Sequence, residues 1–401
     1  MFDLSTAAGI AGAQVLATDE NGAPIGAPVT SKSDGAYSMR VPATRTNSKG
    51  ALAAKKVLLR SQAKNYVPFP SGARISLPID LTNATRGSES EAWVLSSELT
   101  GIGLNPVSAS EQGLPTVSGS IESGAATLVV LEQGTARGRS TLAAPDGTFS
   151  FFNVPPGDAT ISAYRRNQNY SPATVTVADV DVTGVRLERA AAVPASLSGS
   201  VQLVAGANGD GTSVVLAVES TFIEALGRGE VPPGLRAPGT GAPNITGAWL
   251  ITGIPDGRYV VLAAFENDDN VRDPDQGIAG TDLVHIVVTG GTLTGASSTQ
   301  FKVTGAVKIV SPGAENIDEV TATPTFSWKK YSNADAYTLK VFDALGVLIW
   351  AFEIPDGGTT TADYVGPALA TGQTYQWRLI ANRNGGPTSF TEELRGLFIV
   401  R

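Results

Sequence analysis

The residues best suited to chemistry in this chain gather in one acidic segment, between positions 266 and 282. Carboxylate and amide oxygens of this kind are the ligands that Ca²⁺ prefers, because it is a hard cation that takes six to eight oxygen atoms. Carboxylates so close together repel one another unless water or a cation neutralises them. The segment therefore predicts a calcium site, and its candidate ligands are Glu266, Asp268, Asp269, Asp273, Asp275 and Asp282.

The same segment has a second interpretation, a solvated acidic turn. Its spacing is not that of an EF-hand, because Asp273, Asp275 and Gly277 alternate without the glutamate expected at the twelfth position. In a turn of this type Arg272 neutralises one carboxylate, and Asp273-Pro274 sets the bend. The sequence leaves both interpretations open.

No other segment has the residues of a reaction centre at a spacing that singles them out, which leaves open only a hydrolase built of Asp, Glu, Ser and Lys, such as one with paired carboxylates. It contains no cysteine and one histidine, His285, so thiolate metal sites, disulfides and clusters of histidine ligands are excluded. His285 lies in the middle of an apolar strand with Leu283 and Val287 on its own face, and we expect a partly buried structural residue. The sequence predicts no catalytic residue and no cofactor site other than calcium, so we expect a protein that is not an enzyme.

Composition restricts the kinds of partner that we expect the chain to bind and the compartment in which we expect to find it. With a net charge of −8 and charged residues at 16%, the chain would be repelled by a phosphate backbone, so nucleic acid is not expected as a partner. No run of eighteen apolar residues occurs, so no segment is expected to span a membrane. The absence of cysteine, with abundant Thr, Ser, Ala and Gly and few Lys, is typical of bacterial proteins outside the cytoplasm.

A turn followed by a strand recurs along the chain and predicts its architecture. Asp34-Gly35-Ala36-Tyr37, Asp146-Gly147-Thr148-Phe149 and Thr246-Gly247-Ala248-Trp249 are three copies. In the last two copies a second turn follows, and its glycine stands ten residues after the first. Each copy is one supersecondary unit of a β-sandwich, so we predict an all-β chain built as a tandem array of Ig-like or transthyretin-like β-sandwiches.

The repeat frame divides the chain into four sandwiches of about 80 to 110 residues each. We expect a short strand directly after each first turn, at Tyr37–Val41 in the first copy. The third copy carries a long insertion in which Thr221 to Glu224 has capping-box spacing, predicting one or two helical turns and a loop for partner binding. The predicted ranges are 1–82 (first sandwich), 83–115 (linker or edge strand), 116–193 (second), 194–305 (third, insertion 217–245) and 306–401 (fourth).

The first sandwich differs from the others at its start. The second and third copies open with a strand signal, Val117-Ser118-Gly119-Ser120-Ile121 and Leu197-Ser198-Gly199-Ser200-Val201, and the first has no such opener. Only Phe2-Asp3-Leu4 remains to serve as the opening strand. We expect either further sequence upstream or a strand supplied by another segment, because an unpaired edge invites pairing.

The turn motifs resemble those of carboxypeptidase regulatory-like domains, which are transthyretin-like sandwiches related to CnaB-like modules. The fourth sandwich resembles a fibronectin type III domain, on the spacing of Trp328, Leu369, Tyr375 and Trp377. This likeness implies that Tyr375 is a corner tyrosine whose hydroxyl bonds the backbone. Trp249, Trp328 and Trp377 stand at core-like strand positions, Trp350 and Trp93 are less defined, and core packing is the expectation.

Together these features predict a structural or adhesive segment, extracellular or on the outer cell surface of a bacterium, stiffened by calcium. Its expected partners are a protein, a surface polysaccharide, or other copies of itself through the open strand edge of the first sandwich. Two alternatives stay open. One is a carbohydrate-binding accessory region of a larger secreted enzyme, with exposed aromatics at Trp93 or between Phe222 and Leu235. The other is a strand-donating subunit of an extracellular filament.

Overall fold

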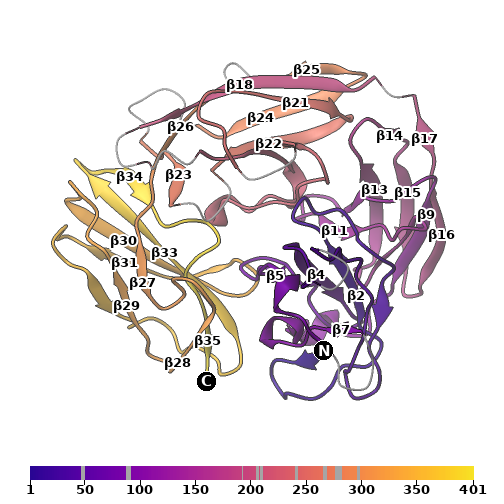
Figure 1. Cartoon of the computed structure of the whole chain (residues 1–401), viewed down its shortest axis with the longest axis horizontal. Coiled ribbons are helices and arrows are strands. Elements are labelled where there is room, and N and C mark those ends of the chain that lie inside the picture. Colours follow the sequence, from indigo (N-terminus) through magenta and orange to yellow (C-terminus); the bar gives the residue numbers. More distant parts are fainter. Residues whose placement is uncertain are drawn as a thin grey trace. The chain divides into compact units, whose positions relative to one another are not determined.

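The structure is a computed structural model that describes residues 1–46, 50–86, 92–191, 193–204, 207, 211–239, 243–264, 269–275, 282–295 and 299–401. Strands hold 47% of the residues and helices 4%, which confirms the all-β prediction (Figure 1). The described helices are short 3-10 turns: η1 Leu81–Asn83, η2 Glu98–Thr100, η3 Ala109–Glu111, η4 Glu219–Thr221 and η5 Glu224–Leu226. None of these turns has the length or the apolar character needed to cross a membrane.

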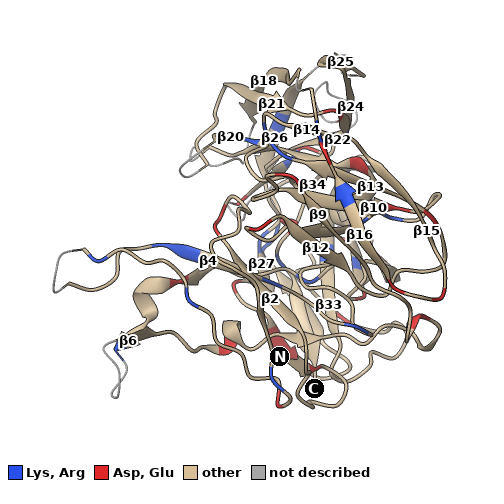
Figure 2. Cartoon of the chain, turned by 90° about the vertical axis from the view of Figure 1, so that its right-hand side faces the viewer, with Lys and Arg blue, Asp and Glu red and all other residues tan. Residues whose placement is uncertain are grey.

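The chain divides into two compact units. The first comprises Met1–Pro70, Ile75–Ala163 and Tyr170–Arg189, and holds the first and second sandwiches. The second comprises Ser71–Arg74, Tyr164–Asn169 and Ala190–Arg401, and holds the third and fourth. Lys and Arg positions and Asp and Glu positions are spread along the chain (Figure 2).

The second sandwich has two layers around one core, an antiparallel sheet and a mixed one. A four-stranded sheet runs in the order β11 (Arg139–Leu142), β10 (Leu128–Glu132), β13 (Gly157–Tyr164) and β15 (Ala173–Val177). A three-stranded sheet runs in the order β12 (Thr148–Phe151), β9 (Val117–Ile121) and β16 (Val182–Leu187). The short strands β14 (Asn169–Tyr170) and β17 (Arg189–Ala190) pair beside them. Alternate residues of both sheets, such as Val129, Ile161 and Leu187, fill the core because strand side chains alternate between faces.

The first sandwich has one sheet of comparable size, in the order β3 (Val29–Thr30), β2 (Gln14–Thr18), β4 (Lys56–Gln62) and β5 (Ile79–Asp80). Its second layer is much smaller. There β1 (Phe2–Asp3) pairs in parallel with β8 (Gly103–Leu104), and β6 (Thr85–Arg86) pairs with β7 (Trp93–Val94). Segment 83–115, the expected linker or edge strand, thus contributes β8 to this layer and Trp93 to the packing around the core.

The third sandwich repeats the plan of the second. One sheet has the order β21 (Ala248–Ile254), β18 (Ala195–Leu203), β26 (Gln300–Gly305) and β23 (Asn270–Arg272). The other has the order β20 (Arg236–Ala237), β19 (Val214–Val218), β22 (Gly257–Ala263), β24 (Val284–Thr289) and β25 (Thr292–Thr294). The helical turn predicted up to Leu226 is present as η5, three residues long, and η4 lies before it. The predicted capping box is not formed, because the N-cap of η5 is Ile223 and the Thr221 hydroxyl donates to the Val218 carbonyl instead.

The fourth sandwich pairs a small sheet with a large one. The small sheet has the order β27 (Ile309–Ser311), β29 (Thr325–Trp328) and β32 (Thr361–Asp363). The large one has the order β28 (Asp318–Val320), β35 (Leu397–Val400), β33 (Thr374–Arg383), β30 (Ala336–Phe342) and β31 (Leu348–Ile354), with β34 (Gly386–Phe390) also on β33.

The aromatic residues of the fourth sandwich lie as the sequence predicts. Trp328 and Trp377 are buried in its core, 2% and 0% exposed, and Trp249 is buried in the third sandwich. The Tyr375 hydroxyl oxygen accepts a hydrogen bond from the Ala370 backbone N–H at 2.8 Å, which confirms the corner tyrosine. Trp350 packs half-buried at the rim of the same core.

In the second and third sandwiches one strand lies between the strand after the aromatic turn and the last strand, and we call it the closing strand. In the second sandwich β9 lies between β12, antiparallel, and β16, parallel. In the third, β18 lies in the same way between β21 and β26. A Cβ at Gly119 would stand 2.1 Å from the Val185 carbonyl oxygen and 2.8 Å from the Phe149 ring, so only glycine fits there. Gly119, which we call the opener glycine of this strand, therefore packs directly against Phe149, the aromatic residue after the turn. Gly199 is the opener glycine of the third sandwich.

The predicted strand Tyr37–Val41 is not a strand in the structure. The residues alternate as a strand would, with Tyr37, Met39 and Val41 against the core, but they pair with no described strand. Among the residues that the structure describes, no strand lies beside them in the position that β9 and β18 take, so the ladder that would define the strand is missing. Strand β5, at Ile79–Asp80, is likewise only two residues long.

Replacing the opener glycine should therefore destabilise a sandwich. In Gly199→Ala the new Cβ would lie 2.1 Å from the Thr299 carbonyl oxygen and 2.6 Å from the Trp249 ring. We expect a loss of about 2 to 3 kcal/mol in the free energy of unfolding of the second unit, measured by urea denaturation with tryptophan fluorescence. Gly247→Ala is the matched control, because nothing lies within 4 Å of its Cβ. Equal effects of the two substitutions would contradict the packing argument.

Candidate functional site: a buried arginine–glutamate junction

The predicted calcium ligands are only partly within the described structure. Glu266 and Asp268 lie outside the described residues. Asp269 pairs with Lys308, whose Nζ is 2.8 Å from its carboxylate. Asp273 is buried and its Oδ1 accepts a hydrogen bond from the Asp275 backbone N–H at 2.9 Å. Among the residues that the structure describes, no group of three acids or histidines is gathered for a metal ion.

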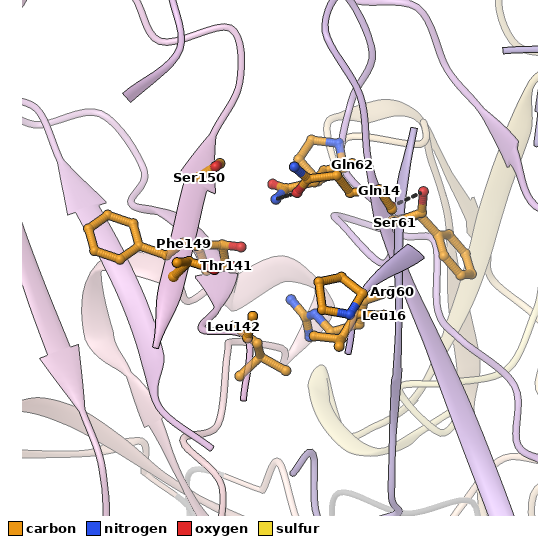
Figure 3. A pocket seen from close by; sticks show the side chains of 15 residues that line it. Gln14, Leu16, Arg60, Ser61, Gln62, Thr141, Leu142, Phe149 and Ser150 are labelled. Atoms are coloured by element: carbon orange, nitrogen blue, oxygen red, sulfur yellow. Dashed lines mark hydrogen bonds between the residues drawn. The ribbon is translucent and has the colours of Figure 1, made fainter. Parts of the chain in front are cut away.

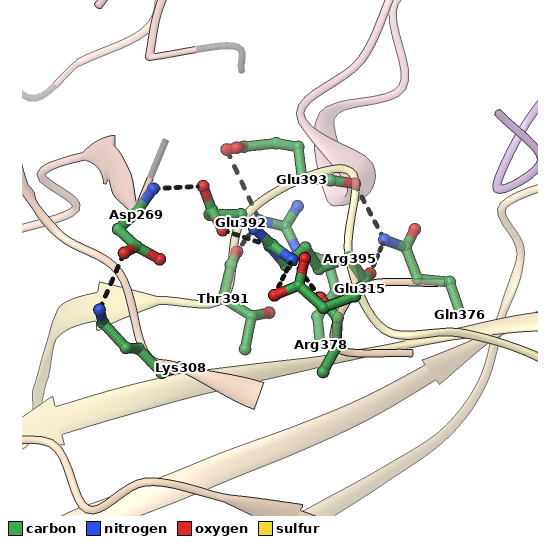
Figure 4. A network of polar contacts seen from close by, with 10 residues as sticks. Asp269, Lys308, Glu315, Gln376, Arg378, Thr391, Glu392, Glu393 and Arg395 are labelled. Carbon is green, nitrogen blue, oxygen red and sulfur yellow. Dashed lines mark hydrogen bonds and ion pairs between the residues drawn. The ribbon is translucent and has the colours of Figure 1, made fainter. Parts of the chain in front are cut away.

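A different set of charged residues lies between the third and fourth sandwiches, within the second unit. We call it the arginine–glutamate junction. Figure 4 shows carboxylates and guanidinium groups of the fourth sandwich converging there, near Asp269 and Lys308. Its members come from the insertion, from β33 and from the loop between β34 and β35. Five of them are buried and the last is half-buried: Arg228, Gln376, Arg378, Glu392, Glu393 and Arg395.

Arg228 brings the insertion into this junction. It follows the turn η5, whose chain reversal is made by Gly227 in the left-handed conformation at φ 65°. Its Nη2 donates to the Gln376 side-chain oxygen at 3.0 Å and also to the Glu393 backbone carbonyl. Its Nη1 donates to the Ala73 carbonyl at 2.9 Å, in the short segment Ser71–Arg74 of the same unit. The fork of a guanidinium is thus used to join separate pieces of backbone.

Arg378 and Glu393 form the buried ion pair of the junction. Their closest atoms, Arg378 Nη2 and Glu393 Oε1, are 3.6 Å apart, and both side chains are 9% exposed. Arg378 Nη2 also donates to the Thr391 carbonyl at 3.0 Å, and the guanidinium lies 4.9 Å from the centre of the Phe390 ring. The second carboxylate oxygen of Glu393 is buried without a hydrogen-bond partner.

Glu392 and Arg395 extend the junction toward the third sandwich. Arg395 Nε lies 2.7 Å from Glu392 Oε2, and the Asp269 backbone N–H donates to Glu392 Oε1 at 2.7 Å. Arg395 also pairs with the exposed Glu315 at 3.2 Å. One carboxylate therefore holds the loop after β22 of the third sandwich against the fourth.

Burial sets the protonation behaviour of these groups. It raises the pKa of Glu393 to about 7, against the opposing effect of Arg378 and Arg228. It also raises the pKa of Glu392, although the hydrogen bond from Arg395 works the other way. Burial, with Arg378 adding repulsion, lowers the pKa of Arg228 to about 9. Most of these charged groups are paired within the junction, and Glu393 Oε2 is buried without a hydrogen-bond partner.

The prediction that His285 is partly buried is wrong. It shares a face with Val287 as expected, but that face is exposed, and Ile286 and Val288 point into the core instead. Its Nδ1 lies 2.7 Å from Glu219 Oε1, and Arg258 Nε lies 2.5 Å from Glu219 Oε2. Burial alone would raise the pKa of Glu219, but hydrogen bonds from Arg258 and His285 hold it below its usual range.

A cavity of about 100 Å³ lies within the first unit (Figure 3). Strands β2 and β4 of the first sandwich line one side, with Gln14, Arg60 and Gln62, and strands β11 and β12 of the second line the other. The Gln62 side-chain N–H donates to the Gln14 side-chain oxygen at 3.1 Å. The lining holds no acid or histidine, so it has no general base.

Sequence reasoning missed the junction although a signal was present. Glu392 and Glu393 are adjacent acids beside a strand in a chain with few charges, and Arg395 follows at once. The sequence alone does not show that Arg228, more than 160 positions before these residues, contacts them in the folded chain.

Comparison with known proteins does not assign this chain to a family. No protein-family model matches the sequence, and a search of curated proteins gives no match. Among solved structures, the Bacillus anthracis TIE protein is 9% identical over 96% of this chain and 67% of that one, with a TM-score of 0.17. The tetra-tandem repeat from the extending region of a large adhesion protein is 11% identical, covers 98% and 92% of the two chains, and has a TM-score of 0.17.

A third solved structure is GBS52, the minor pilin of Streptococcus agalactiae. It is 11% identical over 49% of this chain and all of that one, with a TM-score of 0.16. At TM-scores this low, none of the three similarities carries an argument about what this chain does.

The raised pKa of Glu393 predicts a specific pH dependence. An acid whose pKa is higher in the folded state than its ordinary 4.5 binds a proton on folding between those two values, so its stabilising effect is full below pH 4.5 and is lost as the pH rises through 7. The shift from 4.5 to about 7 corresponds to about 3 kcal/mol. We expect Glu393→Gln to remove that part of the decline in unfolding free energy of the second unit between pH 5 and pH 8.

The measurement is urea denaturation at several pH values. Glu353→Gln, at an exposed glutamate on β31, is the matched control and should keep the slope of the unchanged chain. A Glu393→Gln slope equal to that of the unchanged chain would show that Glu393 does not carry the dependence.

Proposed function

We propose that this chain is a structural or adhesive segment of a bacterial extracellular or cell-surface assembly, without catalytic activity. The support is the tandem series of β-sandwiches, together with an acidic chain and a turn pattern like that of carboxypeptidase regulatory-like and fibronectin type III domains. In this role the molecule holds its neighbours at a set spacing and transmits force between them. Its expected partners are proteins or surface polysaccharides.

The observation that carries the proposal is how the insertion of the third sandwich is used. We expected a loop that displays binding residues, but Leu226 and Leu235 are fully buried, and Arg228 is tied to the fourth sandwich. Gly346, in the turn between β30 and β31, lies so close to the insertion that a Cβ there would be 2.9 Å from Leu226. The insertion therefore acts as a brace between two sandwiches, and a brace is what a load-bearing segment needs.

Burying charges for this purpose has an energetic logic. A buried ion pair contributes little net stability, because the cost of desolvation offsets the attraction. Removing one partner, however, costs about 3 to 5 kcal/mol, since the other charge stays buried and unpaired. The Arg228, Arg378 and Glu393 cluster thus favours one relative placement of the third and fourth sandwiches and penalises others.

Calcium belongs to the proposal as a second stiffening element. Asp269 already contacts Lys308 and, through its backbone, Glu392, so a cation bound by the segment from Glu266 to Asp282 would reinforce the same loop. Asp273 is buried, and burial raises the pKa of its carboxyl, although the charges of Lys302 and Arg272 work the other way.

Calcium binding should be visible as a thermal shift. A ligand that binds only the folded state raises the melting temperature, so millimolar Ca²⁺ should raise that of the second unit and excess chelator should reverse the shift. Asp273→Asn with Asp275→Asn should abolish the response. An unchanged melting temperature in Ca²⁺ would remove calcium from the account and leave the brace in place.

The carbohydrate-binding alternative stays a prediction, and the geometry does not favour it. Trp93 is half-buried against the core of the first sandwich, and Phe222 packs against a core cluster of the third. Neither forms the exposed aromatic platform that stacking on sugars requires.

The brace is tested by single-molecule FRET within the second unit. The chain has no cysteine, so dyes at Thr292→Cys and Thr361→Cys, both exposed, report only the third and fourth sandwiches. We expect one narrow distance distribution, which Arg228→Met broadens because the fork to Gln376 and the Glu393 carbonyl is lost.

Arg258→Met, at an exposed arginine of the same unit, is the control and should leave the distribution narrow. Circular dichroism separates a loosened junction from an unfolded domain. A broad distribution in the unchanged chain would contradict the proposed rigid brace.

A further inference from the structure

One stretch of the first sandwich has basic residues and no acidic ones. Residues 35–79 hold eight of the 29 Lys and Arg residues and none of the 37 Asp and Glu residues. The rest of the chain therefore has 21 basic and 37 acidic residues, which gives it a net charge of −16. A strongly positive segment in an otherwise acidic chain is typical of a surface that meets a partner of negative charge.

The middle of this stretch forms a hairpin, which we call the basic arm (residues 40–56, described except for 47–49). The Ala53 backbone N–H donates to the Thr44 carbonyl at 2.7 Å and joins the two sides of the arm. Leu52 is buried and packs in the core cluster of the first sandwich, so the arm is anchored there. Figure 2 shows the chain projecting beside β4, with blue Lys and Arg positions along it. The arm therefore presents its cations on a hydrogen-bonded hairpin.

The structure leaves two cations of the arm without an acid. Arg40 is exposed, and no carboxylate of the described residues pairs with it. The Lys55 Nζ donates to the Pro42 carbonyl at 3.2 Å, so its ammonium group lies on the side of the arm that carries Arg40, again without a described carboxylate. Lys56 differs, because its Nζ lies 3.6 Å from a carboxylate oxygen of Glu20. Arg40 and Lys55 thus keep positive charge that a partner can neutralise.

The other exposed residues of the arm restrict the chemistry of that partner. Among the described residues they are small or hydroxylated: Pro42, Ala43, Thr44, Thr46, Ala51 and Ala54. None of them offers an aromatic ring for a base to stack on, or a large apolar side chain to anchor a protein partner or enter a bilayer. Threonine hydroxyls, in contrast, donate to and accept from the hydroxyl groups of sugars.

The charge of the remaining chain restricts the partner further. Duplex nucleic acid and anionic membranes carry dense negative charge over a wide surface, so the acidic remainder of the chain would repel them as they approached the arm. A single polysaccharide strand is thin, and its charges are more widely spaced. It can therefore contact the arm and avoid the acidic surfaces.

We propose that the basic arm binds a strand of acidic polysaccharide. Carboxylates of the sugars pair with Arg40, Lys55 and Arg45, which is also exposed, and sugar hydroxyls bond Thr44 and Thr46. The inference rests on the proposed surface role and names the chemistry of one partner. Its failure is distinguishable from failure of that role, because the brace is measured in the other unit.

Binding is tested with fluorescein-labelled oligogalacturonate, a strand of carboxylated sugars, added to the full chain. We expect saturable binding by fluorescence anisotropy. Because salt screens the charges, binding should weaken about 10-fold between about 50 and about 300 mM NaCl. Arg40→Ala combined with Arg45→Ala and Lys55→Ala should weaken binding about 10-fold or more, since three charge-assisted contacts are lost.

The matched control removes three cations elsewhere. Lys329→Ala with Lys330→Ala and Arg383→Ala changes exposed residues of the fourth sandwich and lowers the net charge by the same amount. We expect this variant to bind as the unchanged chain does. Circular dichroism shows whether each variant keeps its β structure. Equal weakening by the two sets would mean that net charge alone drives binding, and the proposal would fail.

Carbodiimide coupling followed by peptide mass spectrometry locates the bound strand, because it joins a carboxylate to a lysine in contact with it. We expect coupling at Lys55 and not at Lys329. Uncharged dextran should not bind, and duplex DNA and phosphatidylglycerol vesicles should bind more weakly than oligogalacturonate. Absence of saturable binding, equal binding of dextran, tighter binding of DNA or of vesicles, or coupling at Lys329 in place of Lys55 would each overturn the proposal.

Discussion

Closure of the second and third sandwiches by a single strand is the constraint on which their structure depends. That strand must exchange backbone hydrogen bonds on both sides, with the strand after the aromatic turn and with the last strand, because buried amides and carbonyls are costly when unpaired. It also crosses an aromatic ring so closely that glycine is needed, as at Gly119 and Gly199. The turn glycine, the aromatic residue and the opener glycine recur together because they are one contact.

The second unit solves a different problem, which is to hold two sandwiches in one placement. Only 16% of the residues are charged, yet several of them lie in one buried junction. There they favour one relative placement of the two sandwiches more than they add to the free energy of unfolding. The insertion of the third sandwich serves this end through Arg228, and the loop after β22 serves it through Asp269 and Glu392.

The sequence predicted what depends on local pattern. The all-β class, the buried tryptophans and the bond of Tyr375 follow from alternation and turn spacing, which act over a few residues. It did not predict features decided by distant partners. Tyr37–Val41 has the pattern of a strand but lacks a neighbour, and His285 has the right face but that face is open. Arg228 meets Glu393 only once two sandwiches pack.

The most direct test of the central claim is native-state hydrogen exchange of the free chain, resolved along the sequence. If one closing strand protects each complete sandwich, amides of Thr148–Phe151 and Ala248–Ile254 should exchange only through large-scale unfolding. Those of Tyr37–Val41, which lack that strand, should exchange at rates close to those of an unfolded chain. Equal slow exchange in all three segments would contradict the account, because protection would then not depend on the closing strand.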